Sequence, residues 1–475
     1  MNVAPHLSCG DLMSTTHPIK KATFFQLAFM IYGAVCAGAF GLEDMISSAG
    51  PGIAILTLLL VPFLFSVPVS FAVGELTAML PVEGGQYRWA RQAFGDFWGF
   101  QAGWWAWMTG VVTNGIFAVL FANYVEYWLP AIRDYHLAAL VQNWPLPDVL
   151  QNLLAKASVH WLICLSLIWF MHVLNLRGIQ VVGNTAILLS IILLIPFAIM
   201  LVLGVASWQH NPFAPFHAPG KNFISGFGSA LVIAIWLYSG YDKLSAAAEE
   251  VENPQRVFPP ALFFAVTLAM LSYVLPTIAG LAALGNWQEW AGAYFSPAAT
   301  KIGGTWLGHA MTFGALCSNA LLLNVTMLAA SRYPLTLAQD GFLPQFLSKL
   351  HSKYGTPAQS LFWGSITYSV LAIFDFTQLT IIYSWFLMSS YILLYANVWM
   401  MRRTHAEMPR PFKIPFGQAG LFLAMLPTCV IALVAMGSTV FEEGEFSQRQ
   451  LAIGALTLLS GPVVYGVVRL LKRQV

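Results

Sequence analysis

Three carboxylates lie within long apolar stretches, where an ionised side chain is costly. Glu43 and Asp44 directly follow a run of small residues at 33–41, and Asp242 ends a short stretch at 238–242 that contains Ser and Gly. Charged groups inside a membrane are rare and usually mark a substrate or ion pathway. A buried carboxylate can bind an amine, and it can also take up a proton. The sequence therefore makes these three residues the candidates for amine binding and for proton coupling.

The backbone beside these carboxylates could also contact a substrate. The first apolar segment contains Ala37, Gly38, Ala39 and Gly41, and the sixth contains Tyr238, Ser239, Gly240 and Tyr241. An interrupted helix exposes N–H and C=O groups that lipid cannot satisfy but a polar substrate can. Interruptions at corresponding places in two halves of a chain predict a transport site. The glycines could instead permit close helix packing, which is the favoured interpretation for Gly33.

The second stretch has a structural alternative, because Asp242 is followed directly by Lys243. The two side chains could form an ion pair that only stabilises the fold. Adjacent side chains on a helix point apart, which argues against this pairing. Asp242 is therefore kept as a functional candidate.

The elements that must position these residues are membrane helices. Hydrophobic residues make up 58% of the 475 residues and charged residues 9%, against about 25% charged in ordinary globular domains. The apolar blocks have about the length that crosses a bilayer core of about 30 Å. A soluble protein would need polar stripes at helical spacing, and these are missing. About twelve transmembrane helices are expected, at 24–48, 53–80, 97–128, 161–176, 181–205, 223–248, 258–284, 309–331, 360–374, 379–400, 421–441 and 451–471.

The basic residues predict the orientation of the chain. If the N-terminal tail, residues 1–23, is cytoplasmic, sixteen of the 22 Lys and Arg fall in inside loops and tails, five fall outside, and Lys243 lies within the sixth segment. Cytoplasmic loops are enriched in Lys and Arg, so we expect both termini to be cytoplasmic. The outside loop 129–158 is amphipathic at 137–154, which fits a helix lying on the membrane and equally an ordinary capping loop. Residues 332–353 form a polar inside stretch with a short helical pattern.

Several functional classes leave no signal in the sequence. No basic stripe supports nucleic-acid binding, and the five scattered cysteines lack metal-ligand spacing. No nucleotide-binding loop, cofactor motif or protease or hydrolase motif is present. No cofactor or metal is therefore expected, and a membrane-embedded enzyme is only a distant alternative. A channel, which normally needs repeated filter elements, is another.

Three motifs lie at the second, sixth and eighth apolar segments. They comprise Gly74-Glu75-Leu76 with Pro81, Gly84-Gly85, Tyr87 and Gly95; Glu250-Val251-Glu252-Asn253-Pro254 with Pro259; and Ser331-Arg332 with Ala338-Gln339-Asp340-Gly341-Phe342-Leu343-Pro344. Together they resemble signatures of the amino acid–polyamine–organocation superfamily. The resemblance implies an all-α membrane fold with a five-plus-five inverted repeat and interrupted helices one and six. The expected units are the repeats 24–205 and 223–400, followed by two peripheral helices at 421–471.

Within the superfamily the chain is most similar to the branch of polyamine:proton symporters and L-type amino acid transporter-like proteins. Its stretch at 40–44 and its third segment resemble theirs, and Trp236 lies where many members carry a gating aromatic residue. The sequence also departs from this pattern. A helix-three aspartate of the plant transporters aligns with Thr113, beside Asn114, and a second acidic position becomes Asn123. A helix-five lysine of some proton-coupled members aligns with Ser190. These changes put a polycationic substrate and the usual coupling residue in doubt.

The expected function is secondary transport of amino acids or small amines, polyamines included, by proton-coupled symport with alternating access across a bacterial inner membrane. An exchanger of the same fold is the main alternative. The partners implied are an amino acid or amine substrate, the proton and the lipid bilayer. The expected substrate-binding residues are Ala37, Gly38, Ala39, Gly41, Glu43, Asn114, Trp236, Tyr238, Ser239, Gly240, Tyr241 and Asp242, with Glu43, Asp44 and Asp242 as coupling candidates.

Overall fold

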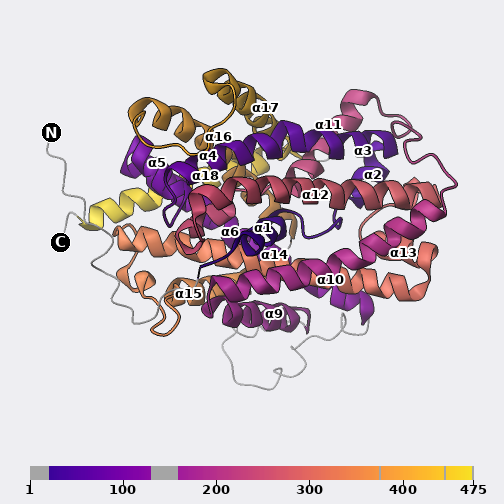
Figure 1. Ribbon diagram of the computed structural model, residues 1–475, viewed down its shortest axis with the longest axis horizontal. Coiled ribbons are helices and arrows are strands. Elements are labelled where there is room, and N and C mark those ends of the chain that lie inside the picture. Colours follow the sequence, from indigo (N-terminus) through magenta and orange to yellow (C-terminus); the bar gives the residue numbers. More distant parts are fainter. Residues whose placement is uncertain (1–20, 130–158, 374–375, 443–444, 473–475) are drawn as a thin grey trace.

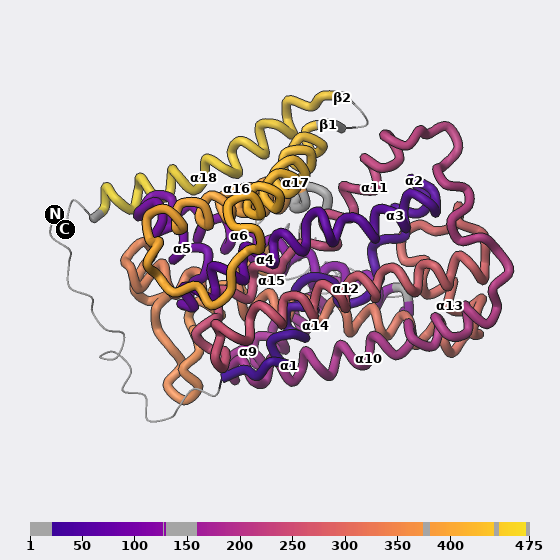
Figure 2. Tube along the Cα trace, turned by 45° about the horizontal axis from the view of Figure 1, so that its top comes forward, coloured from indigo at the N-terminus to yellow at the C-terminus, as the bar shows by residue number. Residues whose placement is uncertain are grey.

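The computed structural model describes residues 21–129, 159–373, 376–442 and 445–472. The long helices run along the longest axis of the molecule, which leaves two opposite ends (Figures 1 and 2). The helix α5 (Gln86–Phe94) lies at one end. At the other end lie α2 (Glu43–Ala49) and α13 (Phe295–Gly303). These two ends are called the α5 end and the α13 end.

The first pass is an interrupted helix, as the sequence predicts. The helix α1 (Phe24–Val35) ends at the run of small residues, and α2 begins only at Glu43. Between them Ala37, Gly38 and Gly41 have φ angles of 47°, 99° and 93°. These values lie in the left-handed region, which glycine adopts without strain and which no α-helix contains. The backbone of the first pass is therefore unwound at 36–42.

The second to fifth passes complete the first group of helices. The second pass is not one α-helix: α3 (Pro51–Val61) passes through a π-helical turn, η1 (Pro62–Ser66), into α4 (Val67–Met79). Pro62 and Pro68 lack the N–H that a regular α-helix needs, and such widened turns are usual where the hydrogen-bond ladder is broken. After α5, three further helices follow: α6 (Asp96–Trp128), α9 (Val159–Leu176) and α10 (Ile179–Ala206).

The sixth pass is the second interrupted helix. The helix α11 (Phe223–Leu237) is followed after an unwound stretch by a 3-10 helix, η3 (Lys243–Glu250). Gly240 in this stretch has a φ angle of 118°. The rest of this group comprises α12 (Pro254–Leu284), η4 (Trp287–Glu289), α13, α14 (Thr305–Gln339), η5 (Gln345–Ser348), α15 (Ala358–Leu371) and α16 (Phe376–Thr404).

Two helices at the edge of the bundle end the chain. The helix α17 (Gly417–Ser438) is joined by a short hairpin of strands β1 (Phe441–Glu442) and β2 (Glu445–Phe446) to α18 (Gln448–Lys472). In α18 22% of the most apolar 18-residue window is buried, against 94% in α14. The helix α14 packs against α6, α10 and α13 in the centre of the bundle. The protein thus has a buried central helix and a peripheral pair.

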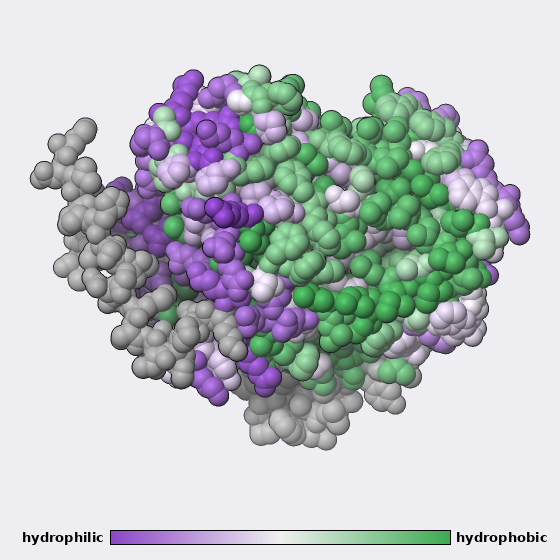
Figure 3. Space-filling view, viewed as in Figure 1, coloured by the Kyte–Doolittle hydropathy of each residue, from purple (hydrophilic) through white to green (hydrophobic). Residues whose placement is uncertain are grey.

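The helices are those of an integral membrane protein. In the described part of the chain nine helices are long and apolar enough to cross a membrane. The two interrupted passes and the 14-residue α15 raise this number to the expected twelve. Hydrophobic side chains cover the middle of the surface in Figure 3, and hydrophilic ones gather toward its ends.

One expected boundary is wrong. The eighth pass was expected at 309–331, but α14 continues to Gln339. Arg332 is fully buried and pairs with Glu250. A charged residue that hydropathy assigns to a loop therefore belongs to a buried helix. The amphipathic segment expected at 137–154 lies outside the described residues.

Candidate functional site

The first interruption turns the backbone N–H of Gly41 toward a carboxylate. This N–H donates a hydrogen bond to Glu43 Oε2 at 2.7 Å, and the Glu43 side chain is fully buried. The neighbouring Asp44 lies on the other side, where its carboxylate accepts a hydrogen bond from the N–H of Gly292 at 2.9 Å. The two adjacent carboxylates therefore do different things: Glu43 folds back on the interruption, and Asp44 contacts the segment that leads into α13.

The second interruption is held by contacts with α5 and α16. The N–H of Gly240 donates to the hydroxyl of Tyr391 at 2.9 Å. The carboxylate of Asp242 accepts two hydrogen bonds, from Gln86 Nε2 at 2.7 Å and from Tyr391 Oη at 3.1 Å. Asp242 thus connects the unwound stretch of the sixth pass with the first residue of α5.

Between the two interruptions lies a space, here called the central cavity, with a volume of about 100 Å³. Its walls come from the first and sixth passes and from α6, α12, α14 and α16. They include Gly41, Trp236, Ser239, Lys243, Tyr273 and Asn319. A small polar molecule that enters here meets both unwound backbones, which is the arrangement that the interrupted helices predict.

The expected site residues divide into two sets around this cavity. Gly41, Trp236 and Ser239 line it. The remaining expected residues do not: these are Ala37, Gly38, Ala39, Glu43, Asn114, Tyr238, Gly240, Tyr241 and Asp242. Asn114 accepts a hydrogen bond from the Thr326 hydroxyl and so joins α6 to α14. The hydroxyl of Tyr238 donates to the carbonyl oxygen of Leu58 at 2.8 Å.

Sequence reasoning missed several residues of the walls. Tyr273, Asn319 and Tyr383 line the cavity although they lie in helices that carry no interruption. Lys243 lines it too, and its Nζ lies 3.4 Å from the carbonyl oxygen of Ala34 at the end of α1. A signal for Lys243 was available, because it is the single Lys or Arg in the middle of a predicted membrane segment, whereas Arg469 lies at the very end of the last one.

A wider cavity of about 610 Å³ adjoins the central cavity on the side of the α13 end. It is lined by Asp44, Asn123 and Gly292 among others, and it shares Gly41, Trp236 and Tyr383 with the central cavity. A Cβ atom added at Gly41 would lie 3.2 Å from the ring of Trp236. The indole therefore lies over the first interruption, in the wall between the two cavities.

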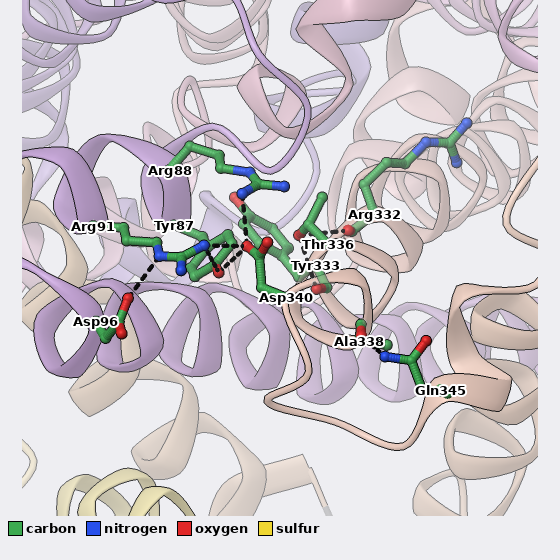
Figure 4. A network of polar contacts seen from close by, with 10 residues as sticks. All are labelled: Tyr87, Arg88, Arg91, Asp96, Arg332, Tyr333, Thr336, Ala338, Asp340 and Gln345. Carbon is green, nitrogen blue, oxygen red and sulfur yellow. Dashed lines mark hydrogen bonds and ion pairs between the residues drawn. The ribbon is translucent and has the colours of Figure 1, made fainter. Parts of the chain in front are cut away.

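Ion pairs close the opposite, α5 end. The guanidinium of Arg332 forms hydrogen bonds of 2.7 and 3.0 Å with the carboxylate of Glu250. The carboxylate of Asp340 forms ion pairs with Arg88 at 2.6 Å and with Arg91 at 2.7 Å (Figure 4). It also accepts a hydrogen bond from the hydroxyl of Tyr87. These contacts join α5 and η3 to the last turns of α14. Their residues include Tyr87, Glu250, Arg332 and Asp340 of the three sequence motifs.

Two further features reinforce this closure. The carboxylate of Glu75 in α4 accepts hydrogen bonds of 2.7 and 2.6 Å from Arg402 of α16. Ala22 pairs with the chain at 250–252 as a single parallel β-bridge.

Beside these contacts lies Glu83, in the loop before α5. Burial, reinforced by the nearby Glu250 carboxylate, raises the pKa of Glu83 to about 8, although Arg332 acts in the opposite direction.

Across the residues that the structure describes, no three His, Cys, Asp or Glu side chains gather as metal ligands. The polar groups of the central cavity are hydroxyl, amide and ammonium groups, which suit a small organic molecule rather than a divalent cation.

Known proteins resemble this chain over nearly its whole length. A probable polyamine transporter of Arabidopsis thaliana is 32% identical over 92% of this chain and 85% of its own length. The polyamine transporter RMV1 of the same plant is 28% identical over 95% of this chain and 89% of its own length. A more distant relative is the branched-chain amino acid permease BcaP of Bacillus subtilis, which is 23% identical over 86% of this chain and 87% of its own length. The sequence model of the family described as amino acid permease matches residues 23–456. The chain belongs to the amino acid permease family.

Proposed function

We propose that this protein is a secondary active transporter that carries amino acids or small amines by proton-coupled symport with alternating access. The observation that carries this proposal is the placement of the central cavity. It lies at both interrupted passes, adjoins a wide cavity on one side and is separated from the other end by ion pairs, of which the pair of Arg332 and Glu250 is buried. A site with access from one side at a time is what alternating access requires.

The two groups of helices fit a repeated architecture. Residues 24–205 and 223–400 each begin with an interrupted pass and continue through four more passes. We assign them as the two repeats and 421–471 as a peripheral pair. The excess of Lys and Arg in loops at the α5 end supports a cytoplasmic location for that end and for both termini. We propose a bacterial inner membrane as the location.

Among the three coupling candidates, Asp242 has the contacts that best fit a coupling role. Its carboxylate accepts hydrogen bonds from both Gln86 and Tyr391. Protonation converts one carboxylate oxygen into a donor, so one of these bonds must be lost or reversed. Uptake of a proton at Asp242 would thereby loosen α5 from the sixth pass and favour opening of the α5 end. Glu43 and Asp44 contact backbone N–H groups and lack such a connection.

The test is uptake by purified protein in proteoliposomes with an imposed inward proton gradient. The labelled compounds are L-alanine, L-leucine, L-arginine, putrescine and spermidine. We expect uptake of at least one compound, driven by the gradient, and loss of the gradient dependence in Asp242→Asn, whose amide cannot take up a proton. The matched controls are Glu43→Gln and Asp44→Asn. Gradient-driven uptake by Asp242→Asn would exclude Asp242 as the coupling residue.

Exchange is the second candidate function for this fold. It is separated from symport by counterflow, in which unlabelled substrate inside the vesicles replaces the proton gradient. Uptake that depends on internal substrate and ignores the gradient would replace symport with exchange. Absence of uptake of all five compounds under both conditions would remove the transport proposal for these substrates.

A further inference from the structure

The side chain of Lys243 is unusual because it places an ammonium group in the wall of the central cavity. It folds back over the second interruption, where a Cβ atom added at Gly240 would lie 3.3 Å from both Lys243 Cε and Nζ. Its Nζ reaches the carbonyl oxygen of Ala34 at 3.4 Å, in the last turn of α1. The free carbonyl groups at the end of a helix favour a cation, so this position suits a charged ammonium.

No carboxylate faces Lys243 across the cavity. The described lining contains no Asp or Glu, and Lys243 is its single Lys or Arg. Asp242 directs its carboxylate to Gln86 and Tyr391, and no ion pair within 4.0 Å joins it to Lys243 in the described part of the chain. Glu43 accepts from the backbone of Gly41 instead. The charged side chain in the lining of this cavity is therefore that of Lys243, while the Asp242 carboxylate lies beside it in the wall of a smaller cavity.

The charge and size of the cavity limit what it can hold. A cation is repelled by a nearby ammonium in a site shielded from water, and an anion is attracted. The volume of about 100 Å³ is smaller than the cavity of about 150 Å³ that holds benzene in an engineered protein. A substrate larger than benzene must therefore extend into the adjoining wide cavity, which shares Gly41, Trp236 and Tyr383 with this one. A polycation is disfavoured by the charge of Lys243.

We propose that Lys243 binds the carboxylate of the substrate, so that the central cavity takes small carboxylate-bearing molecules such as amino acids and excludes polyamines. This assignment rests on the proposed transport function and narrows its substrate class. The ammonium of a bound amino acid then lies away from Lys243, against the aromatic rings of Trp236 and Tyr273, whose faces attract cations. The named plant relatives are described as a probable polyamine transporter and a polyamine transporter, so this proposal gives the present chain a specificity different from the one in their names.

The test compares binding within pairs of compounds that differ only in the carboxylate. Equilibrium binding to the purified wild-type protein in detergent is measured for L-alanine and ethylamine, L-leucine and 3-methylbutylamine, and L-arginine and agmatine, with putrescine and spermidine added. We expect at least one amino acid to bind and its amine partner to bind about tenfold or more weakly, the usual loss when a hydrogen bond to a charged group is removed. Equal binding of an amine partner, tight binding of a polyamine, or binding of no amino acid would each overturn the assignment.

Variants then attribute the preference to this residue. Lys243→Met should lose the difference between amino acid and amine, and Lys243→Arg should retain it, because the guanidinium also binds a carboxylate. Lys413→Met, an exposed lysine outside the cavity, is the matched control. Size-exclusion profiles report folding. If Lys243→Met does not fold, the binding of the compound pairs to the wild type and to Lys243→Arg decides whether the assignment holds. An unchanged preference in folded Lys243→Met would overturn the assignment.

The same proteins separate this assignment from the broader one. Binding of an amino acid without uptake in proteoliposomes contradicts the transport function and leaves the role of Lys243 intact. Uptake of putrescine or spermidine supports transport and contradicts the role of Lys243.

Discussion

At the scale of single residues, the environment of each ionisable group differs sharply from what its place in the sequence suggests. Glu43 and Asp44 are neighbours, yet one is buried against Gly41 and the other lines the wide cavity. Asp242 and Lys243 are neighbours too and share the wall of a small cavity, yet only Lys243 also lines the central cavity. The direction of each side chain depends on the φ and ψ angles of the unwound backbone. Sequence spacing therefore identified the interruptions but not which charge faces the cavity.

Glu83 gives a pH prediction at this scale. Its ordinary pKa of 4.5 is raised to about 8 in the folded protein, so between these values the folded state holds a proton that the unfolded state has released. Stability must then fall as the pH rises through this window. Glu83→Gln stays neutral and avoids the loss. We expect its melting temperature to exceed that of the wild type by about 2 °C or more at pH 8.5, and to match it near pH 4.5.

The measurement is thermal unfolding in detergent, followed at a series of pH values for the two proteins. Glu252→Gln, an exposed carboxylate of the neighbouring loop, is the control and should show no such pH-dependent difference. Parallel curves for wild type and Glu83→Gln between pH 5 and 8.5 would contradict the raised pKa.

At the scale of elements, the ion pair of Arg332 and Glu250 holds α14 against η3. The Arg332 side chain is fully buried and Glu250 is 15% exposed. Removing one partner of a buried pair leaves an uncompensated charge, which costs about 3–5 kcal/mol. We expect Arg332→Met and Glu250→Gln each to lower the melting temperature strongly. The double variant should recover part of the loss, because neither charge then remains unpaired.

Thermal unfolding in detergent measures all three proteins, with Arg256→Met as a control at an exposed arginine in the first turn of α12. If the double variant were as unstable as the sum of the two single variants, the pair would not act as a unit.

The fold was largely predictable at the scale of elements. Long apolar segments predicted the passes, and the small residues at 37–41 and the stretch with Ser239 and Gly240 predicted the two interruptions. The end of the eighth pass was not predictable, because hydropathy treats Arg332 as solvated while its partner Glu250 is 82 residues away in the sequence. The same limit applies to the walls of the central cavity. Tyr273 and Asn319 are ordinary helix residues until packing brings them to the interruptions.

At the scale of the whole molecule, the two ends differ in access. The wide cavity of about 610 Å³ lies on the side of the α13 end, while the α5 end is closed by ion pairs. We expect a cysteine at position 123 to react with a membrane-impermeant maleimide added outside intact cells. Thr109 is 4% exposed and lines a small cavity beside Asp242, so Thr109→Cys should stay unlabelled.

The experiment uses Asn123→Cys and Thr109→Cys in a background from which the five native cysteines are removed. Labelling is read by mass shift before and after permeabilising the cells. External labelling of Thr109→Cys, or labelling of Asn123→Cys only after permeabilisation, would contradict the proposed access from outside.

The contrast between α14 and α18 has a consequence for how lipid acts on this protein. Almost the whole of α14 is shielded by other helices, whereas most of the apolar surface of α18 faces outward. A change in bilayer thickness is felt by helices in contact with acyl chains, which tilt or bend to match it. Such a change acts directly on α18, and also on α9, α10 and α17, of whose most apolar windows 33%, 33% and 39% are buried. Where α17 and α18 cover α16 and α6, the acyl chains meet this pair instead of those two helices.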